Sequence, residues 1–131
     1  MNPVSALVVD TSCWIEFFRG RSLPILELAL KEGRVVLSPI VIAELLSSTL
    51  SRSAERRLVD FLQDLEIHPT PTTHWLAVGR LRRSCRKSGI SLSTSDAHVA
   101  QCALDREAFL YSFDKVFQKI SPKMALKLIP E

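Results

Sequence analysis

The chain has 131 residues, with 17 Lys and Arg against 14 Asp and Glu, a formal charge of +3 and 47% hydrophobic residues. This length and apolar content predict one globular domain over residues 1–131, too small for a second lobe. The composition excludes disordered and fibrous classes. No apolar run approaches the roughly 20 residues of a membrane span, because Glu44 interrupts the longest candidate, so we expect a soluble protein with no membrane partner.

The cysteines and the first residues indicate the compartment. Cys13, Cys85 and Cys102 are odd in number and lack C-x-x-C spacing, and residues 1–9 lack the pattern of a signal peptide. Both observations predict a reducing, cytoplasmic location. A sequence pI near 9.0 permits a polyanionic partner without requiring one.

The first half of the chain alternates between strand and helix patterns. Residues 4–9 and 35–37 are short apolar runs typical of buried parallel strands. Between them we expect a turn around residues 14–18, then a helix that Ser22 caps and that stops near Gly33. A further helix is predicted to begin at Pro39, and another follows the basic segment 51–57.

The second half continues the alternation. Helices are predicted from Thr72 or Thr73 to Gly89, behind the polar run 93–96, and at 114–120. Short strands are predicted at 66–68, 109–111 and 126–129. Strands that alternate with helices indicate a single-domain, three-layer α/β/α sandwich around a mostly parallel sheet of about five strands.

Four acids fall just beyond predicted strands. Asp10 ends the first strand, Glu44 lies about two helical turns beyond the second, Asp96 begins a helix, and Asp114 follows the fourth strand. Ligands of open α/β sheets bind outside the carboxyl ends of the strands. Converging carboxylates repel one another, and an all-oxygen cage suits Mg²⁺ or Mn²⁺ rather than zinc. Such ions support phosphodiester hydrolysis, so the acids predict a metal-dependent nuclease.

Each acid also has an ordinary structural interpretation. Asp96 and Asp114 can each serve as helix caps, and Asp10 suits a turn. Glu44 is the hardest to explain in this way. It interrupts the apolar run 39–46, and a carboxylate among apolar neighbours usually has a partner or a role.

Four segments together resemble the PIN domain, in particular the single-domain VapC-type toxin ribonucleases of bacterial and archaeal toxin–antitoxin pairs. These segments are residues 8–12, 38–45, 95–100 and 110–114, and the resemblance extends from residue 7 to about 117. It implies that Asp10, Glu44, Asp96 and Asp114 form a catalytic, metal-binding quartet. Ser12 and Ser112 match hydroxyl residues that orient the carboxylates.

The resemblance also implies a substrate, a cofactor and partners. Family members hydrolyse RNA, commonly tRNA or rRNA, with Mg²⁺ or Mn²⁺ and a metal-activated water. They form homodimers and are blocked by a cognate antitoxin that covers the acidic pocket. The chain departs from the pattern at Val116, where a fifth acid is frequent, and at His98, which occupies a commonly aliphatic position.

A basic helix offers candidate RNA contacts. Arg82, Arg83, Arg86 and Lys87 share a face opposite Leu81 and Cys85, which suits either phosphate contacts or simple solvation. The aromatic residues Trp14, Phe17, Phe18 and Trp75 are expected to pack in the core or between subunits rather than to stack on bases.

Two other functions compete with the nuclease. A non-catalytic PIN-like module that binds RNA or protein would use the basic helix and leave the acids structural. A phosphoacceptor receiver domain would need paired acids after the first strand, whereas Thr11 and Ser12 follow Asp10. If the quartet forms one pocket, 10 acids remain against 17 bases, so the rest of the surface is distinctly basic.

Overall fold

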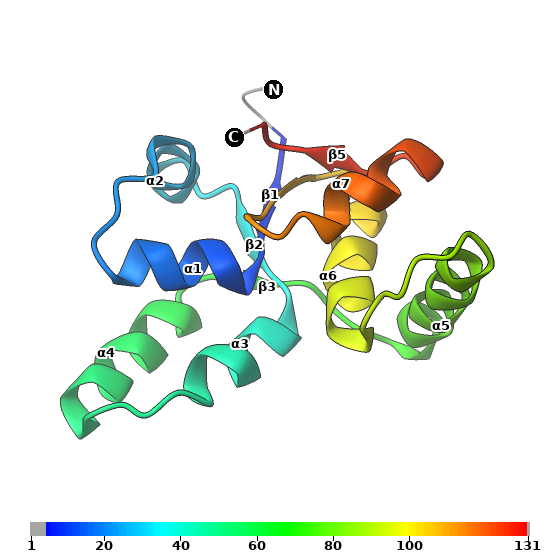
Figure 1. Ribbon diagram of the computed structural model, residues 1–131. Helices are drawn as coiled ribbons and strands as arrows, with labels where there is room; N and C mark the ends of the chain where they lie inside the picture. Colours follow the sequence, from blue (N-terminus) through cyan, green and yellow to red (C-terminus); the bar gives the residue numbers. More distant parts are fainter. Residues whose placement is uncertain (1–4, 131) are drawn as a thin grey trace.

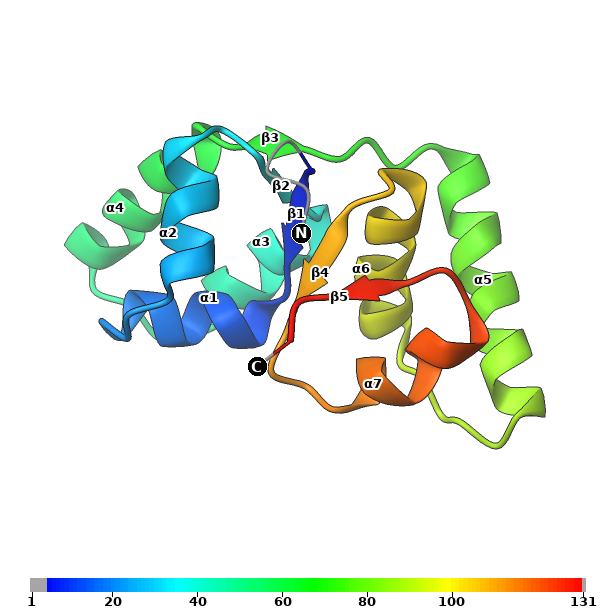
Figure 2. The same cartoon turned by 90° about the horizontal axis from the view of Figure 1, so that it is seen from above.

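A five-stranded sheet, parallel throughout, lies between two layers of helices in the computed structural model, which describes residues 5–130 (Figure 1, Figure 2). The strand order is β3-β2-β1-β4-β5. The strands are β1 (Leu7–Val9), β2 (Val35–Leu37), β3 (Glu66–Ile67), β4 (Phe109–Tyr111) and β5 (Lys127–Leu128). The predicted α/β/α architecture is therefore confirmed. After β1 the chain places β2 and β3 on one side of β1, and it then places β4 and β5 on the other side. The topological switch point therefore lies between β1 and β4.

The helices divide into two groups on either side of the sheet. Figure 2 shows α1, α2 and α4 on one side and α5, α6 and α7 on the other. The helices are α1 (Thr11–Phe18), α2 (Pro24–Lys31), α3 (Pro39–Leu46), α4 (Arg52–Gln63), α5 (Thr72–Lys87), α6 (Thr94–Asp105) and α7 (Val116–Ile120), followed by the 3₁₀ turn η1 (Ser121–Lys123). None of the helices in residues 5–130 is long and apolar enough to cross a membrane.

The central strands form the middle of the core. All three residues of β1 are completely buried, and β2 is buried along its whole length. Both faces of a parallel sheet are covered, so its inner strands consist of apolar residues without alternation. Asp10 directly follows β1, and residues 112–114 directly follow β4. The buried strands therefore fix the positions of these residues.

Three local predictions were wrong at helix starts. The turn expected around residues 14–18 is the helix α1, because burial of Cys13 and Trp14 on one side stabilises a helix there. Ser22 does not cap α2. Its N-cap is Leu23, with Pro24 in the first turn, and Glu27 accepts a hydrogen bond from the Leu23 N–H at 2.9 Å. The basic segment 51–57 already belongs to α4, whose cap is Ser51.

An aromatic cluster joins α1 to α4. Trp14 is completely buried and packs edge-on against Phe17 and Phe61, with ring centroids 5.9 and 5.7 Å apart. Phe18 stacks on Trp14 but is 43% exposed. The expectation that these rings serve packing is met by Trp14, whereas Phe18 leaves apolar surface open to solvent.

Helices α5 and α6 lie antiparallel beside each other (Figure 2). Gly89, at φ +79°, ends α5 in a left-handed conformation that favours glycine. Ser93 then starts α6 by accepting a hydrogen bond from the Asp96 N–H at 3.0 Å. The turn between them places the first residues of α6 at the carboxyl end of the sheet.

Candidate active site

The predicted acids gather around the carboxyl ends of β1 and β4. Asp10 follows β1, and its backbone N–H donates to the Tyr111 carbonyl of β4 at 2.9 Å. Asp114 lies just beyond β4, Asp96 lies in the first turn of α6, and Glu44 lies on α3. This is the switch point of the sheet, where ligands of parallel sheets bind.

Two serine hydroxyls hold the carboxylate of Asp10. Ser112 donates to Asp10 Oδ2 at 2.7 Å, and Ser12 donates to the same oxygen at 3.1 Å. Each hydroxyl also accepts a backbone N–H at 3.0 Å, Ser112 from Asp114 and Ser12 from Phe113. Because each hydroxyl accepts from the backbone, its proton is directed at Asp10. The two serines thus hold one oxygen of the Asp10 carboxylate by hydrogen bonds.

A third hydroxyl holds Glu44. Thr11 Oγ1 donates to Glu44 Oε1 at 2.8 Å, which ties the second acid to the first turn of α1. No sequence pattern assigns a role to Thr11. Its position directly after Asp10, at the start of a helix, was the available signal. Glu44 is exposed, so it is not a buried carboxylate although its sequence neighbours are apolar. The bond from Thr11 gives it the partner that the sequence could not identify.

The capping interpretations are decided separately for Asp96 and Asp114. Ser93 is the cap of α6, and the Asp96 carboxylate lies in its first turn and also accepts a hydrogen bond from Ser93. Asp114 Oδ1 accepts the Val116 N–H at 3.0 Å and therefore does help to start α7. Oδ1 of Asp114 thus accepts the hydrogen bond from the helix, and Oδ2 can accept a further hydrogen bond or bind a ligand.

Electrostatics couple the four acids. Burial raises the pKa of Asp10 above its ordinary value, the hydrogen bonds from Ser112 and Ser12 oppose this, and the charge of Glu44 adds to the rise. Burial also raises the pKa of Asp96, and repulsion from Asp10, Asp114 and Glu44 raises it further. The four carboxylates therefore lie within mutual electrostatic reach, and the site has a deficit of positive charge.

The donor set fits a hard divalent cation. It consists of carboxylate oxygens, and two of the acids have raised pKa values that a cation would lower. Within residues 5–130, the group of ligand atoms packed within 4.8 Å of one another is formed by other residues, His68, His74 and Cys102. The wider spacing of the acids suits an ion that keeps part of its water shell, as Mg²⁺ does.

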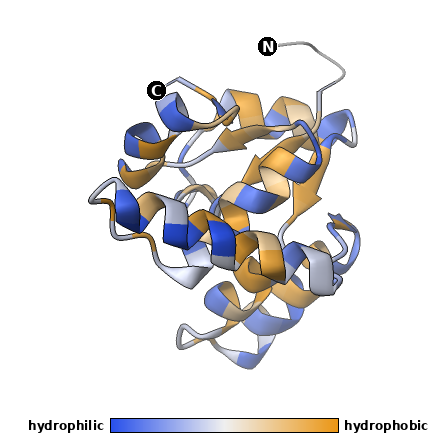
Figure 3. Ribbon diagram, turned by 90° about the vertical axis from the view of Figure 1, so that its right-hand side faces the viewer, coloured by the Kyte–Doolittle hydropathy of each residue, from blue (hydrophilic) through white to orange (hydrophobic). Residues whose placement is uncertain are grey.

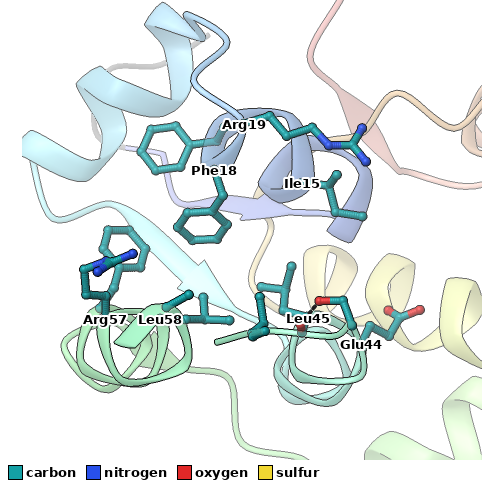
Figure 4. A pocket seen from close by; sticks show the side chains of 12 residues that line it. Ile15, Phe18, Arg19, Glu44, Leu45, Arg57 and Leu58 are labelled. Carbon is teal, nitrogen blue, oxygen red and sulfur yellow. Dashed lines mark hydrogen bonds between the residues drawn. The ribbon is translucent and has the colours of Figure 1, made fainter. Parts of the chain in front are cut away.

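An apolar groove adjoins the acids. It has a volume of about 730 Å³ between α1, α3 and α4, and Figure 4 shows Glu44 at one end of it. Ile15, Phe18, Leu45 and Leu58 contribute apolar walls, and other lining residues include Arg19 and Arg57. The same side chain, Glu44, thus belongs to both the acidic site and the groove.

The basic residues of α5 lie on its last two turns. Arg83, Arg86 and Lys87 are exposed, and Figure 3 shows hydrophilic and hydrophobic residues mixed along α5. Arg82 differs, because its Nε donates to the Leu92 carbonyl at 2.8 Å and the side chain is half-buried. Arg82 therefore secures the α5–α6 turn, whereas the other three cations are available to a partner.

His98 does not join the acids. It is completely buried on α6, and its Nδ1 lies 2.8 Å from Nε2 of His74. Sequence spacing does not show which way the His98 side chain points, because its partner His74 lies on a different helix.

Comparison with solved structures finds similar folds. A chain of the VapBC2 complex from Rickettsia felis, bound to a promoter DNA fragment, has a TM-score of 0.77 at 21% identity, covering 95% of this chain and 97% of that one. A chain of VapBC-5 from Mycobacterium tuberculosis, a toxin–antitoxin system, has a TM-score of 0.72 at 24% identity, with 97% and 99% covered. No curated protein matches by sequence.

The family comparison covers most of the chain. The model of the PIN domain matches residues 7–122, which include all four acids and both supporting serines. The resemblance noted from the sequence is thereby confirmed: the chain belongs to the PIN domain family.

Proposed function

We propose that this protein is a metal-dependent endoribonuclease and the toxin of a toxin–antitoxin pair. The observation that carries the proposal is the convergence of four mutually repelling carboxylates, with Asp10 held by two directed hydroxyls at 2.7 and 3.1 Å. Asp96 and Asp114 also lie at helix starts, but a helix start alone does not explain why Asp10, Asp114 and Glu44 all lie within electrostatic reach of Asp96. Membership of the PIN domain family and fold similarity to chains of VapBC complexes support the same activity.

The proposed roles follow from the contacts. Asp10, Glu44, Asp96 and Asp114 would hold Mg²⁺ or Mn²⁺, which would supply positive charge for the phosphate and lower the pKa of a water. Ser12 and Ser112 fix Asp10 by hydrogen bonds, and Thr11 fixes Glu44. These three are positioning residues. The chain's own contribution is an acidic cage prepared before the substrate arrives.

RNA is the substrate that the charges favour. Without the four site acids, 17 basic residues stand against 10 acids, so the surface around the site attracts a polyanion. Arg83, Arg86 and Lys87 are the exposed candidates for phosphate contacts. We propose tRNA or rRNA as the class of target, with the cleaved bond in a single-stranded or looped region.

The apolar groove is the proposed place of the antitoxin. A partner segment lying along α1, α3 and α4 would cover Phe18 and reach Glu44. It would block access to the acids without contacting the strands. We further propose a homodimer in the cytoplasm. The free, buried thiols Cys85 and Cys102 support a reducing compartment. Light scattering of the purified protein measures whether two copies associate.

The decisive experiment is RNA cleavage by the purified, antitoxin-free protein. Total RNA is incubated with Mg²⁺, Mn²⁺ or EDTA, and products are mapped for the wild type, Asp10→Asn and the matched control Asp60→Asn. Asp60 is an exposed acid of α4 outside the site. We expect discrete products with metal, none with EDTA, and loss of cleavage in Asp10→Asn only.

Two outcomes would refute the enzyme. Equal products from the wild type and Asp10→Asn would identify a contaminating nuclease. RNA binding without cleavage in either metal would instead support the non-catalytic module, and Arg86→Glu would then reduce the affinity.

A further inference from the structure

All three histidines of the chain meet at one buried place. His68 follows β3, His74 lies in the first turn of α5, and His98 lies on α6. They are 6%, 3% and 0% exposed. Cys102 and Asp105 of α6 complete the group, which we call the histidine cluster. It lies further along α6 than Asp96 and contains none of the four site acids.

Short contacts connect the five side chains. Asp105 Oδ2 lies 3.2 Å from His74 Nδ1 and 3.5 Å from His68 Nε2. His74 Nε2 lies 2.8 Å from His98 Nδ1, and His98 Nε2 lies 3.7 Å from Cys102 Sγ. Residues 98, 102 and 105 share one face of α6 because they are spaced four and three apart. That face points at the start of α5.

The ligand atoms are spaced for a metal ion. Those of His68, His74 and Cys102 all lie within 4.8 Å of one another. Tetrahedral zinc, with Zn–N near 2.0–2.1 Å and Zn–S near 2.3 Å, separates its ligand atoms by about 3.3–3.8 Å. The contacts from Asp105 to the two imidazoles already match that separation. Asp105 lies outside that group of three, so a four-ligand site closes only if Cys102 and Asp105 move toward each other.

We propose that the histidine cluster binds one zinc ion through His68, His74, Cys102 and Asp105. Two imidazoles, a thiolate and a carboxylate are ligands that zinc accepts, whereas Mg²⁺ prefers oxygen alone. Coordination through Nδ1 of His74 keeps the bond from its Nε2 to His98, which then orients the ligand. The Asp105 side chain is 35% exposed and provides the path to solvent.

The ionisable groups of the cluster are compatible with a bound cation. Burial raises the pKa of the Cys102 thiol to about 12, and burial with repulsion from His74 and His68 lowers the pKa of His98 to about 4. Partial burial would raise the pKa of Asp105, but hydrogen bonds from Gln101, His74 and His68 outweigh it. The cluster thus places one carboxylate beside imidazoles and a thiol, and zinc would add positive charge and convert the thiol to a thiolate.

One nitrogen also lacks a partner. His68 Nδ1 is buried and has no hydrogen-bond partner among residues 5–130. A buried polar atom without a partner is costly in a hydrogen-bonded network. The bound ion would join the segment after β3 to α5 and α6, and so would fix the helix that begins near Asp96.

The test uses cobalt as the probe, because Co²⁺ replaces zinc and is coloured. The protein is stripped with EDTA and titrated with Co²⁺, and absorption is followed in the visible and near-ultraviolet regions. We expect one equivalent to give a strong tetrahedral spectrum and a thiolate-to-cobalt charge-transfer band. Added Zn²⁺ should abolish both, and Mg²⁺ should not.

Matched variants separate this site from the acids. Cys102→Ser should lose the charge-transfer band, whereas Cys85→Ser, another buried thiol on α5, should keep it. Asp10→Asn should also keep it. Zn²⁺ at about 100 times its dissociation constant should raise the melting temperature of the wild type by about 10 °C and leave Cys102→Ser unchanged.

The proposal is overturned if the folded wild type shows no charge-transfer band. It is also overturned if zinc raises the melting temperature of Cys102→Ser and the wild type equally. Should Cys102→Ser fail to fold, Asp105→Asn replaces it, because Asp105 is partly exposed and an amide preserves its shape. A cobalt affinity unchanged in Asp105→Asn would then reject the carboxylate as a ligand and with it the proposed site.

Discussion

The acidic site and the histidine cluster lie on the same helix but are built in opposite ways. At the start of α6, Asp96 joins three acids, of which Glu44 and Asp114 are exposed. Further along, His98, Cys102 and Asp105 meet two buried imidazoles. Asp10 and Glu44 accept hydrogen bonds from hydroxyls of α1 and of the segment after β4, whereas the cluster residues contact one another.

The difference shows how one small fold can separate hard from soft ligands. Carboxylates gather where strands end and water enters, and a hydrated divalent cation suits that place. Imidazole and thiol groups gather between α5 and α6, where water is excluded, and a borderline cation suits that place. In the two proposals each site has its own metal preference, and changes in one should leave the other intact.

The largest expected effect is on catalysis. Asp96→Asn should slow RNA cleavage about 1,000-fold, since removing one metal-binding carboxylate costs several kcal/mol of transition-state stabilisation. The cobalt–thiolate spectrum of the same variant should be unchanged. Cleavage rates and cobalt absorption are measured on the same preparation. If Asp96→Asn lost both, the two sites would not be independent.

The next effect is on stability as a function of pH, in EDTA. The pKa of His98 is lowered to about 4 from 6.5, so the unfolded chain binds more protons between these values. Stability should therefore fall as the pH is lowered from 6.5 to 4, by about 3 kcal/mol for this group. Urea denaturation at several pH values measures the slope, and a slope unchanged in His98→Gln would contradict the assignment.

A smaller effect is expected from the hydroxyl that holds Asp10. Ser112→Ala removes the 2.7 Å bond to Oδ2 and the bond from the Asp114 N–H, so cleavage should fall about 10- to 100-fold. The control is Ser51→Ala, which removes the cap of α4. It should cost about 1 kcal/mol of stability and leave the cleavage rate unchanged. Equal rates for Ser112→Ala and the wild type would exclude a positioning role.

The smallest effect has the opposite sign. Without metal, Asp10→Asn should stabilise the fold by about 1 kcal/mol, because it removes a buried charge that Glu44 and Asp96 repel while retaining an oxygen acceptor. The free energy of unfolding in urea with EDTA measures this change. A loss of stability would mean that the hydroxyl bonds to the carboxylate outweigh the repulsion.

Patterns within short stretches predicted much of the fold. Apolar runs of three to six residues identified the strands, and helical spacing identified most helices. The start of α1 was missed because only its contacts with α4 show why residues 14–18 are helical. Such contacts join residues more than 40 positions apart, so no local period records them.

The roles of the candidate site residues remain a prediction, although the structure brings the four acids within electrostatic reach of Asp96. Asp10, Glu44, Asp96 and Asp114 follow from one rule, that polar residues after parallel strands meet at the sheet edge. The bond from Thr11 to Glu44 does not follow from that rule, because it depends on how α3 is turned against α1.

The sequence by itself determined the layered architecture, the four acids and the basic excess, since alternation, spacing and charge are properties of the chain. Only the tertiary structure decided which hydroxyl holds which carboxylate and that three scattered histidines share one buried space. Side chains from separate elements meet according to strand order and helix rotation. Both are set by burial of the whole core rather than by any single segment.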